Sequence, residues 1–207
     1  MDEYFTLRQE ANDEYVVKHS RFIGYAAPVQ TQEEAVAFIN QIRARHWDAR
    51  HNVYAYVLRD GQIKRYSDDG EPQGTAGMPV LDVLLKENLT DCCVVVTRYF
   101  GGILLGGGGL VRAYSHTAKL GVDAAQKIKM ALCVRAEANC DYGFYGKLSA
   151  MIPEAGGTVE STDFTDRVSV CFTMPQHLYD GFCAAVFDAS LGKVSPAQRE
   201  TLFAPAK

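Results

Sequence analysis

Apolar and polar residues recur in the first part of the chain with the spacings of short strands and amphipathic helices. Residues 14–17 and 21–26 are predicted to be two strands joined by a polar turn. Thr31 and Glu34 have the spacing of an N-terminal capping box. Apolar residues then follow at helical spacing, which predicts a helix ending near Arg45.

The next segments extend this alternation of strands and helices. Residues 52–58 are rich in strand-forming side chains, and Asp60-Gly61 predicts a two-residue hairpin turn into a strand at 62–66. Pro79 fits the first turn of a helix, and residues 94–99 form an almost wholly apolar strand of the kind that is buried on both faces. Residues 110–126 are predicted to form a long helix. The order ββ-α-ββ-α-β-α indicates a sheet covered by helices.

The pattern begins again near residue 131. Strands are predicted at 131–138, 158–164, 168–174 and 200–203, and helices at 142–155 and 175–189. A β-α-β-β-α-β order is typical of the ferredoxin-like arrangement. We therefore expect an α+β protein with two domains, residues 1–130 and 131–207, and no proline- or serine-rich linker between them.

Composition narrows the class of protein. The chain of 207 residues is 47% hydrophobic and 22% charged, as in ordinary globular proteins, and its net charge of −4 gives no overall attraction to nucleic acid. The acidic start does not resemble a signal peptide, and no apolar run is long enough to span a membrane. We expect a cytoplasmic protein. The six cysteines form no C-x-x-C pair, so reduced thiols are favoured over a zinc site.

Two glycine-rich segments, 68–77 and 101–109, lie on either side of one predicted helix and one strand, and we expect them to form the functional surface. The second segment joins a strand to a helix, where a phosphate cradle would lie. It lacks the Lys-Ser/Thr of a Walker loop, and Val111 replaces the third glycine of the dinucleotide fingerprint. An NTPase or dehydrogenase is therefore disfavoured. The alternative is that the glycines only permit close packing.

The charged residues of this region leave two further choices open. The sequence Asp68-Asp69-Gly70-Glu71 could hold magnesium or supply acid–base groups, or it could form a solvated turn. Basic residues between 43 and 65, interleaved with aromatic residues, suit phosphates and unpaired bases, although such charges can also simply be solvated. Arg98 and Arg112 flank the second glycine-rich segment, and His51 is the histidine with the strongest claim to a function.

Four motifs carry a resemblance to a known family: HNVYAY at 51–56, SDDGEPQGTAG at 67–77, VVVTRYFGG at 94–102 and LGGGGLVRAY at 105–114. In this order they resemble the IMPACT/YigZ family, and its bacterial YigZ-like branch in particular. The resemblance implies an N-terminal domain like domain IV of elongation factor G and a C-terminal domain like domain V. Both domain folds imply contact with RNA or the ribosome by analogy. Eukaryotic relatives act in translational control, which implies binding linked to translation.

These observations favour a non-enzymatic binding protein that contacts RNA, the ribosome or a translation factor. The alternative is a metal-dependent enzyme acting on a small phosphorylated or carboxylated substrate through the acidic loop. No catalytic residue, metal ligand or cofactor is assigned, no membrane partner is expected, and the oligomeric state is left open. The predicted binding residues are His51, Arg65, Asp68, Asp69, Glu71, Gly74, Gly77, Arg98, Tyr99, Gly101, Gly102, Gly109 and Arg112.

Overall fold

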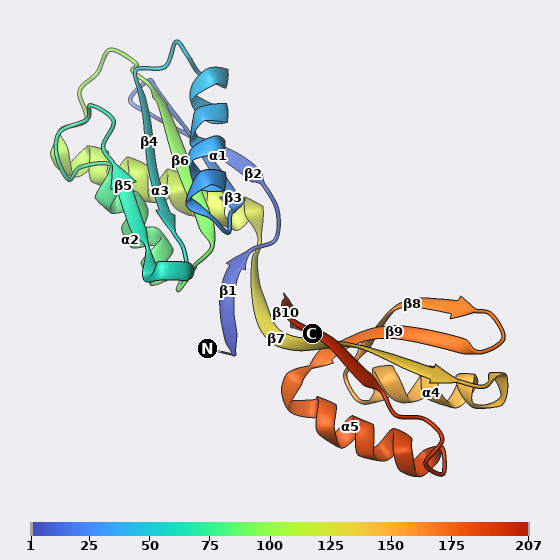
Figure 1. Ribbon diagram of the computed structural model, residues 1–207. Helices are drawn as coiled ribbons and strands as arrows, with labels where there is room; N and C mark the ends of the chain where they lie inside the picture. Colours follow the sequence, from blue (N-terminus) through green and yellow to red (C-terminus); the bar gives the residue numbers. More distant parts are fainter. Residues whose placement is uncertain (1, 207) are drawn as a thin grey trace. The chain divides into compact units, whose positions relative to one another are not determined.

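The computed structural model describes residues 2–206, which divide into two compact units (Figure 1). The N-terminal unit is Tyr4–Ile128, and the C-terminal unit is residues 129–206 together with Asp2 and Glu3. No helix in this part of the chain is long and apolar enough to cross a membrane. Each unit has a sheet and helices of its own, as expected for the α+β class.

The N-terminal unit is a five-stranded antiparallel sheet with helices on both faces (Figure 1). The strand order is β2-β3-β6-β4-β5. Its elements are β1 (Glu3–Leu7), β2 (Ala11–Val17), β3 (Ser20–Pro28), α1 (Gln32–Arg45), β4 (His51–Val57), a 3-10 turn (Asp60–Gln62), β5 (Lys64–Ser67), α2 (Gly77–Lys86), β6 (Cys92–Tyr99) and α3 (Gly107–Ala125).

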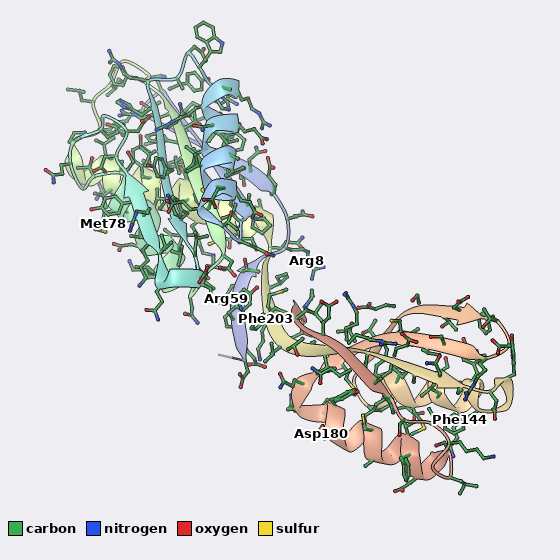
Figure 2. All side chains as sticks on the ribbon, viewed as in Figure 1. Arg8, Arg59, Met78, Phe144, Asp180 and Phe203 are labelled. Carbon is green, nitrogen blue, oxygen red and sulfur yellow. The ribbon has the colours of Figure 1, made fainter. Side chains whose placement is uncertain are left out.

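The central strand β6 explains the apolar run in the sequence. Side chains of β6 alternate between two separate cores, one that includes α1 and one that includes α2 and α3. Val94 and Val96 belong to the α2–α3 core, whereas Cys93 and Val95 belong to the α1 core. The side chains that fill these layers are drawn in Figure 2. Residues 92–96 of the strand are therefore all apolar because neither face of this part of β6 meets water.

Helix α3 lies very close to β3, and two glycines make this approach possible. A Cβ atom at Gly24 would lie 2.3 Å from the carbonyl oxygen of Thr117, and a Cβ at Gly121 would lie 2.7 Å from that of Gly24. Neither distance is compatible with a side chain. Glycine at both positions thus fixes the distance between this helix and the sheet.

Most predicted elements of this unit are confirmed, and three details differ. Strand β1 was not predicted. The turn between β4 and β5 contains four residues rather than two, because the amide of Leu58 bonds to the carbonyl of Ile63. Helix α3 begins three residues before the predicted start, so that glycines form its first turn. Thr31 caps α1 as predicted, accepting a hydrogen bond from the amide of Glu34.

The C-terminal unit contains β7 (Lys127–Cys140), α4 (Tyr142–Glu154), β8 (Thr158–Phe164), β9 (Val168–Pro175), α5 (Gln176–Ala189) and β10 (Ala197–Pro205). Strand β7 pairs with β9 and β10, and β8 pairs with β9, which gives the order β10-β7-β9-β8. This order and the β-α-β-β-α-β sequence of elements make the unit ferredoxin-like, as predicted. Strand β1 also pairs with β7.

The two faces of the C-terminal sheet differ in character. One face is covered by α4 and α5 and buries residues such as Val134, Phe172 and Ile152. The other face carries charged and polar side chains, with Arg135 bonded to Glu160 at 2.8 Å and Arg199 bonded to Glu137 at 2.8 Å. These exposed pairs satisfy one another and contribute little to stability individually.

Candidate functional site

Four loops of the N-terminal unit meet at one end of its sheet. The register pairs Arg21 with Tyr99 and His51 with Arg98, so β3 and β4 begin where β6 ends. Strand β5 ends nearby, with Ser67 opposite Tyr54. We call this end of the sheet, with the loops 18–19, 46–50, 68–76 and 100–106, the loop end. Both glycine-rich segments lie there.

A buried ion pair joins the first glycine-rich segment to the end of β6, shortly before the second segment. The Arg98 guanidinium lies 2.5 Å from the Glu71 carboxylate, and these side chains are only 7% and 4% exposed. The Tyr114 hydroxyl on α3 donates to the same carboxylate oxygen at 2.8 Å. Burial, with the negative charge of Glu71 beside it, raises the pKa of Tyr114, so this hydroxyl stays protonated and remains a donor. Glu71 therefore fastens β6, α3 and the first glycine-rich loop together.

His51 completes this arrangement from the start of β4. Its Nδ1 lies 2.8 Å from the carbonyl oxygen of Asp69, and its Nε2 lies 3.9 Å from Glu71. Because a carbonyl only accepts, Nδ1 carries the proton of this hydrogen bond. His51 thus helps to hold the acidic loop against the sheet.

The other two carboxylates of the acidic loop are also bound by the protein. Asp68 accepts from the amides of Gly74, Ala76 and Gly77 at 2.9, 3.1 and 2.8 Å. Asp69 accepts from the amide of Asn52 at 2.6 Å and from Arg43 at 2.8 Å. Across the described chain, no three His, Cys, Asp or Glu side chains are grouped so as to hold a metal ion. The carboxylates of Asp68 and Asp69 are therefore engaged by backbone amides and Arg43 of the protein itself.

Close packing explains some of the glycines but not all of them. A Cβ atom at Gly101 would lie 2.0 Å from the backbone of His19, and one at Gly77 would lie 2.7 Å from that of Ser67. Gly74 and Gly102 have positive φ values of 75° and 84° with open space around them, so the backbone bend requires glycine there. At Gly109, a Cβ would lie 3.1 Å from that of Leu105.

The predicted cationic residues have very different surroundings. Arg98 is 6% exposed and lies over the rings of Phe22 and Phe100, at 5.4 and 5.5 Å. The structure therefore does not present Arg98 to an external phosphate, which would first have to displace Glu71. Arg65 is exposed on the edge strand β5, and Arg112 is exposed on α3. Of the two arginines that flank the second glycine-rich segment, only Arg112 is accessible.

Large apolar side chains are exposed at the loop end. Trp47 is one of the aromatic residues interleaved with the basic residues between 43 and 65, whereas the apolar residues of loop 100–106 were missed by the sequence reasoning. Trp47 is 83% exposed and Leu104 is 81% exposed, although both are large and apolar. Phe100 and Ile103 are exposed by 42% and 43% in the same loop as Leu104. Their signal in the sequence is an apolar cluster inside a loop rather than inside a periodic element. The exposed side chains of Arg45 and Arg50 lie on either side of Trp47 in the chain.

A chain of hydrogen bonds supports the loop that carries Trp47. The Tyr99 hydroxyl donates to Asp48 at 3.0 Å, so it accepts from Nδ1 of His46 at 2.9 Å. Nε2 of His46 then accepts from the Tyr25 hydroxyl at 2.6 Å. This places neutral His46 between a donor and an acceptor. Burial and the neighbouring Arg45 lower the pKa of His46.

This geometry predicts an acid-sensitive contribution to stability. The unfolded chain binds the His46 proton at its ordinary pKa of 6.5, above the folded value. The stabilisation that neutral His46 contributes to the folded protein is therefore complete above pH 6.5, and it is lost as the pH falls through the folded pKa. Denaturant unfolding between about pH 7.5 and 5 should show the stability difference between wild type and His46→Gln shrinking on acidification. A difference that stays constant across this range would contradict the assignment.

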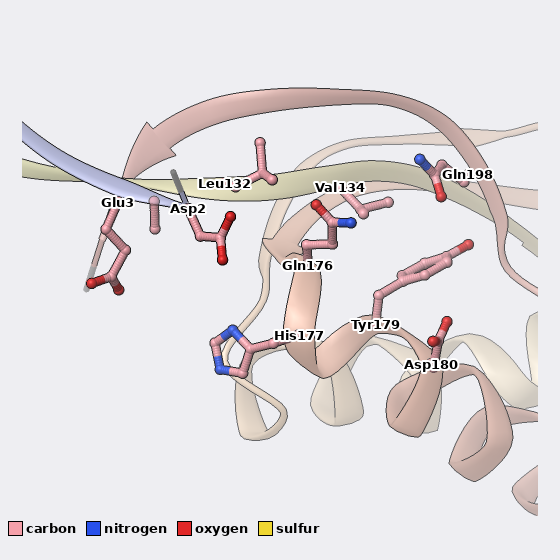
Figure 3. Close-up of a pocket in the computed structure, with 10 residues that line it drawn as sticks. Asp2, Glu3, Leu132, Val134, Gln176, His177, Tyr179, Asp180 and Gln198 are labelled. Carbon is pink, nitrogen blue, oxygen red and sulfur yellow. The ribbon is translucent and has the colours of Figure 1, made fainter.

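The C-terminal unit has a separate hollow of about 790 Å³, drawn in Figure 3. Asp2, Glu3 and Asp180 line it together with His177 and two glutamines. Glu3 is already paired with Lys129 at 2.7 Å. The acidic lining is unsuited to phosphate groups. The loop end thus remains the candidate functional site.

Comparison with known proteins agrees with this division of the chain. Residues 18–122 match the Impact N-terminal domain, and residues 139–193 match a domain of unknown function, DUF1949. The fold and the glycine-rich loops are thus those of an IMPACT-type protein. The chain belongs to the IMPACT family, which confirms the resemblance seen in its motifs.

The relatives that cover most of the chain are bacterial. The IMPACT family member YvyE of Bacillus subtilis is 40% identical over 166 residues, which are 80% of this chain and 76% of that protein. The member YigZ of Escherichia coli is 34% identical over 181 residues, 86% of this chain and 89% of that protein. A crystal structure described as that of a hypothetical protein, 32% identical, has a TM-score of 0.62 and covers 97% of this chain and 98% of its own.

Proposed function

We propose that this protein binds ribosomal RNA through the loop end of its N-terminal unit, in the cytoplasm, and thereby acts on translation without catalysing a reaction. One observation carries the proposal. Exposed aromatic and aliphatic side chains (Trp47, Phe100 and Leu104) gather at the same end of the sheet as the exposed arginines Arg45 and Arg50. Unpaired bases stack on apolar rings while cations bind the phosphates between them.

Hydrogen bonds and an ion pair hold the loops that carry these exposed side chains, which favours a preformed binding surface over flexible loops. The His46 chain of hydrogen bonds holds the loop of Trp47, and the Glu71–Arg98 pair lies directly beneath Phe100. A rigid support limits the entropy lost when a partner binds. The one acidic side chain in loop 46–50, Asp48, accepts a hydrogen bond from Tyr99. Ribosomal RNA also agrees with the translational role that the family resemblance implies.

The proposal predicts salt-sensitive binding to ribosomes. Wild-type protein should sediment with bacterial ribosomes at low salt and stay in the supernatant at high salt, because phosphate contacts release counterions. The double variant Arg45→Glu, Arg50→Glu should fail to sediment under both conditions. Its matched control is Lys86→Glu, Lys147→Glu, which makes the same change of charge at exposed positions at the end of α2 and on α4, outside the loop end. The control should sediment like wild type.

Two outcomes would overturn the proposal. Equal loss of sedimentation in both double variants would mean that overall charge, rather than the loop end, governs the interaction. Wild-type protein that stays in the supernatant at low salt would remove ribosome binding altogether. Circular dichroism of each variant checks that the fold is retained.

A further inference from the structure

A groove of about 640 Å³ lies between strand β2 and helix α3 of the N-terminal unit. Tyr15, Val17 and Lys18 line it from the end of β2 and the following turn. Arg112 and His116 line it from α3, and Leu105 lines it from the second glycine-rich segment. Its volume falls within the range of about 300–1,000 Å³ that is common for small-ligand sites.

The alternation of side chains along β2 determines what this groove presents. Tyr15 and Val17 face α3, and the Tyr15 ring meets His116 edge-on with 4.6 Å between ring centroids. Glu14 lies on the opposite face of the strand, where it pairs with Arg21 at 2.6 Å. Among the described residues that line the groove there is no aspartate or glutamate. A groove with two permanent cations and no carboxylate is notable in a chain of net charge −4.

The lining combines two kinds of chemistry. Lys18 and Arg112 bind anions, whereas Tyr15, Val17 and Leu105 offer an apolar surface. Inorganic phosphate would use only the cations, and duplex RNA would present phosphates while keeping its bases stacked inside the helix. A nucleotide of single-stranded RNA offers both an anion and a flat, unstacked base. It therefore matches both parts of the lining.

We propose that this groove binds one nucleotide of a single-stranded RNA, with its phosphate on Lys18 and Arg112 and its base against the apolar side of the groove. The inference rests on the proposed function and names the form of RNA that the protein prefers. The groove is continuous in sequence with the loop end, since Lys18 precedes His19 in the β2–β3 turn and Leu105 follows Leu104. An RNA strand crossing the loop end can thus continue into the groove.

The test is fluorescence anisotropy with a short labelled oligouridine and with a labelled RNA duplex of equal length, at several salt concentrations. Wild type should bind the single strand more tightly than the duplex. Arg112→Ala and Lys18→Ala should each weaken binding about tenfold and reduce the slope of log affinity against log salt by about 0.7. Tyr15→Leu should weaken binding with an unchanged slope, because it removes a stacking ring but no charge. Lys86→Ala is the control and should bind like wild type.

These experiments can contradict the groove inference and the proposed function separately. If Arg112→Ala and Lys18→Ala keep wild-type affinity and slope while Arg45→Glu, Arg50→Glu loses ribosome sedimentation, the groove inference is wrong and the proposed function stands. Equal binding of single strand and duplex also overturns the groove inference. If wild type binds neither oligouridine nor ribosomes, both are wrong.

Discussion

Replacing Glu71 by glutamine is expected to lower the free energy of unfolding by about 3–5 kcal/mol, because it leaves Arg98 charged and buried without its counter-charge. Arg98 is 6% exposed, and its Nε already lacks a hydrogen-bond partner within the described chain. The variant also loses the charged acceptor of the Tyr114 hydroxyl. Urea unfolding followed by circular dichroism measures the change.

Two further variants make this result interpretable. Glu10→Gln makes the same chemical change at an exposed position and should alter stability by less than about 0.5 kcal/mol. The double variant Glu71→Leu, Arg98→Met removes both charges and should recover much of the loss, because apolar side chains can fill the space of a buried ion pair. A Glu71→Gln protein as stable as wild type would show that water reaches and solvates Arg98.

Gly24→Ala is expected to destabilise the N-terminal unit by about 3 kcal/mol, since one added methyl group forces α3 away from β3. The new Cβ would lie 2.3 Å from the carbonyl oxygen of Thr117, and neither of these backbones can rotate out of the way as a side chain can. The affected core includes Phe22 and Tyr114, whose rings meet edge-on. Thermal and urea unfolding both report the effect.

The control for this substitution is Gly181→Ala in helix α5, where an added Cβ meets nothing within 4 Å. It should stabilise the protein by up to about 1 kcal/mol, because alanine favours a helix over glycine. Gly121→Ala addresses the same contact as Gly24→Ala from the helix side. Once either substitution has moved α3 away from β3, the second substitution should lower the stability little further. The losses of stability caused by the two substitutions should therefore be clearly non-additive. Full additivity would mean that the helix does not move as one body.

Local signals predicted most of the fold. Helix α1 was predicted from its cap at Thr31 and from the spacing of its apolar residues. Both signals lie within one short segment of the sequence, which ends at Arg45. Strand β1 escaped prediction because it is five residues long and pairs with β7, whose sequence lies more than a hundred residues away. The four-residue turn after β4 was not predicted because Gly61 and Gln62 both adopt positive φ. A positive φ is uncommon for glutamine, so the sequence does not indicate it.

Part of the arrangement at the loop end could be predicted from the sequence. The motifs indicated that 68–77 and 101–109 act together, and the structure brings both to one end of the sheet. The pairing of Arg98 with Glu71 could not be read from the sequence, because the partners are 27 residues apart and on different elements. The exposure of Trp47 could not be predicted from the sequence either, since only the tertiary fold decides which aromatic residues are buried.

The division of the chain has a consequence for how the protein is made. The N-terminal unit is one continuous segment, Tyr4–Ile128, so all of its sequence has been synthesised before most of the C-terminal unit exists. The C-terminal unit instead draws on both ends of the chain, because the carbonyl of Asp2 accepts from the amide of Leu132. Contacts between such distant residues close a long loop and form slowly. The hydrogen bond between Asp2 and Leu132 therefore forms only after translation has passed Leu132.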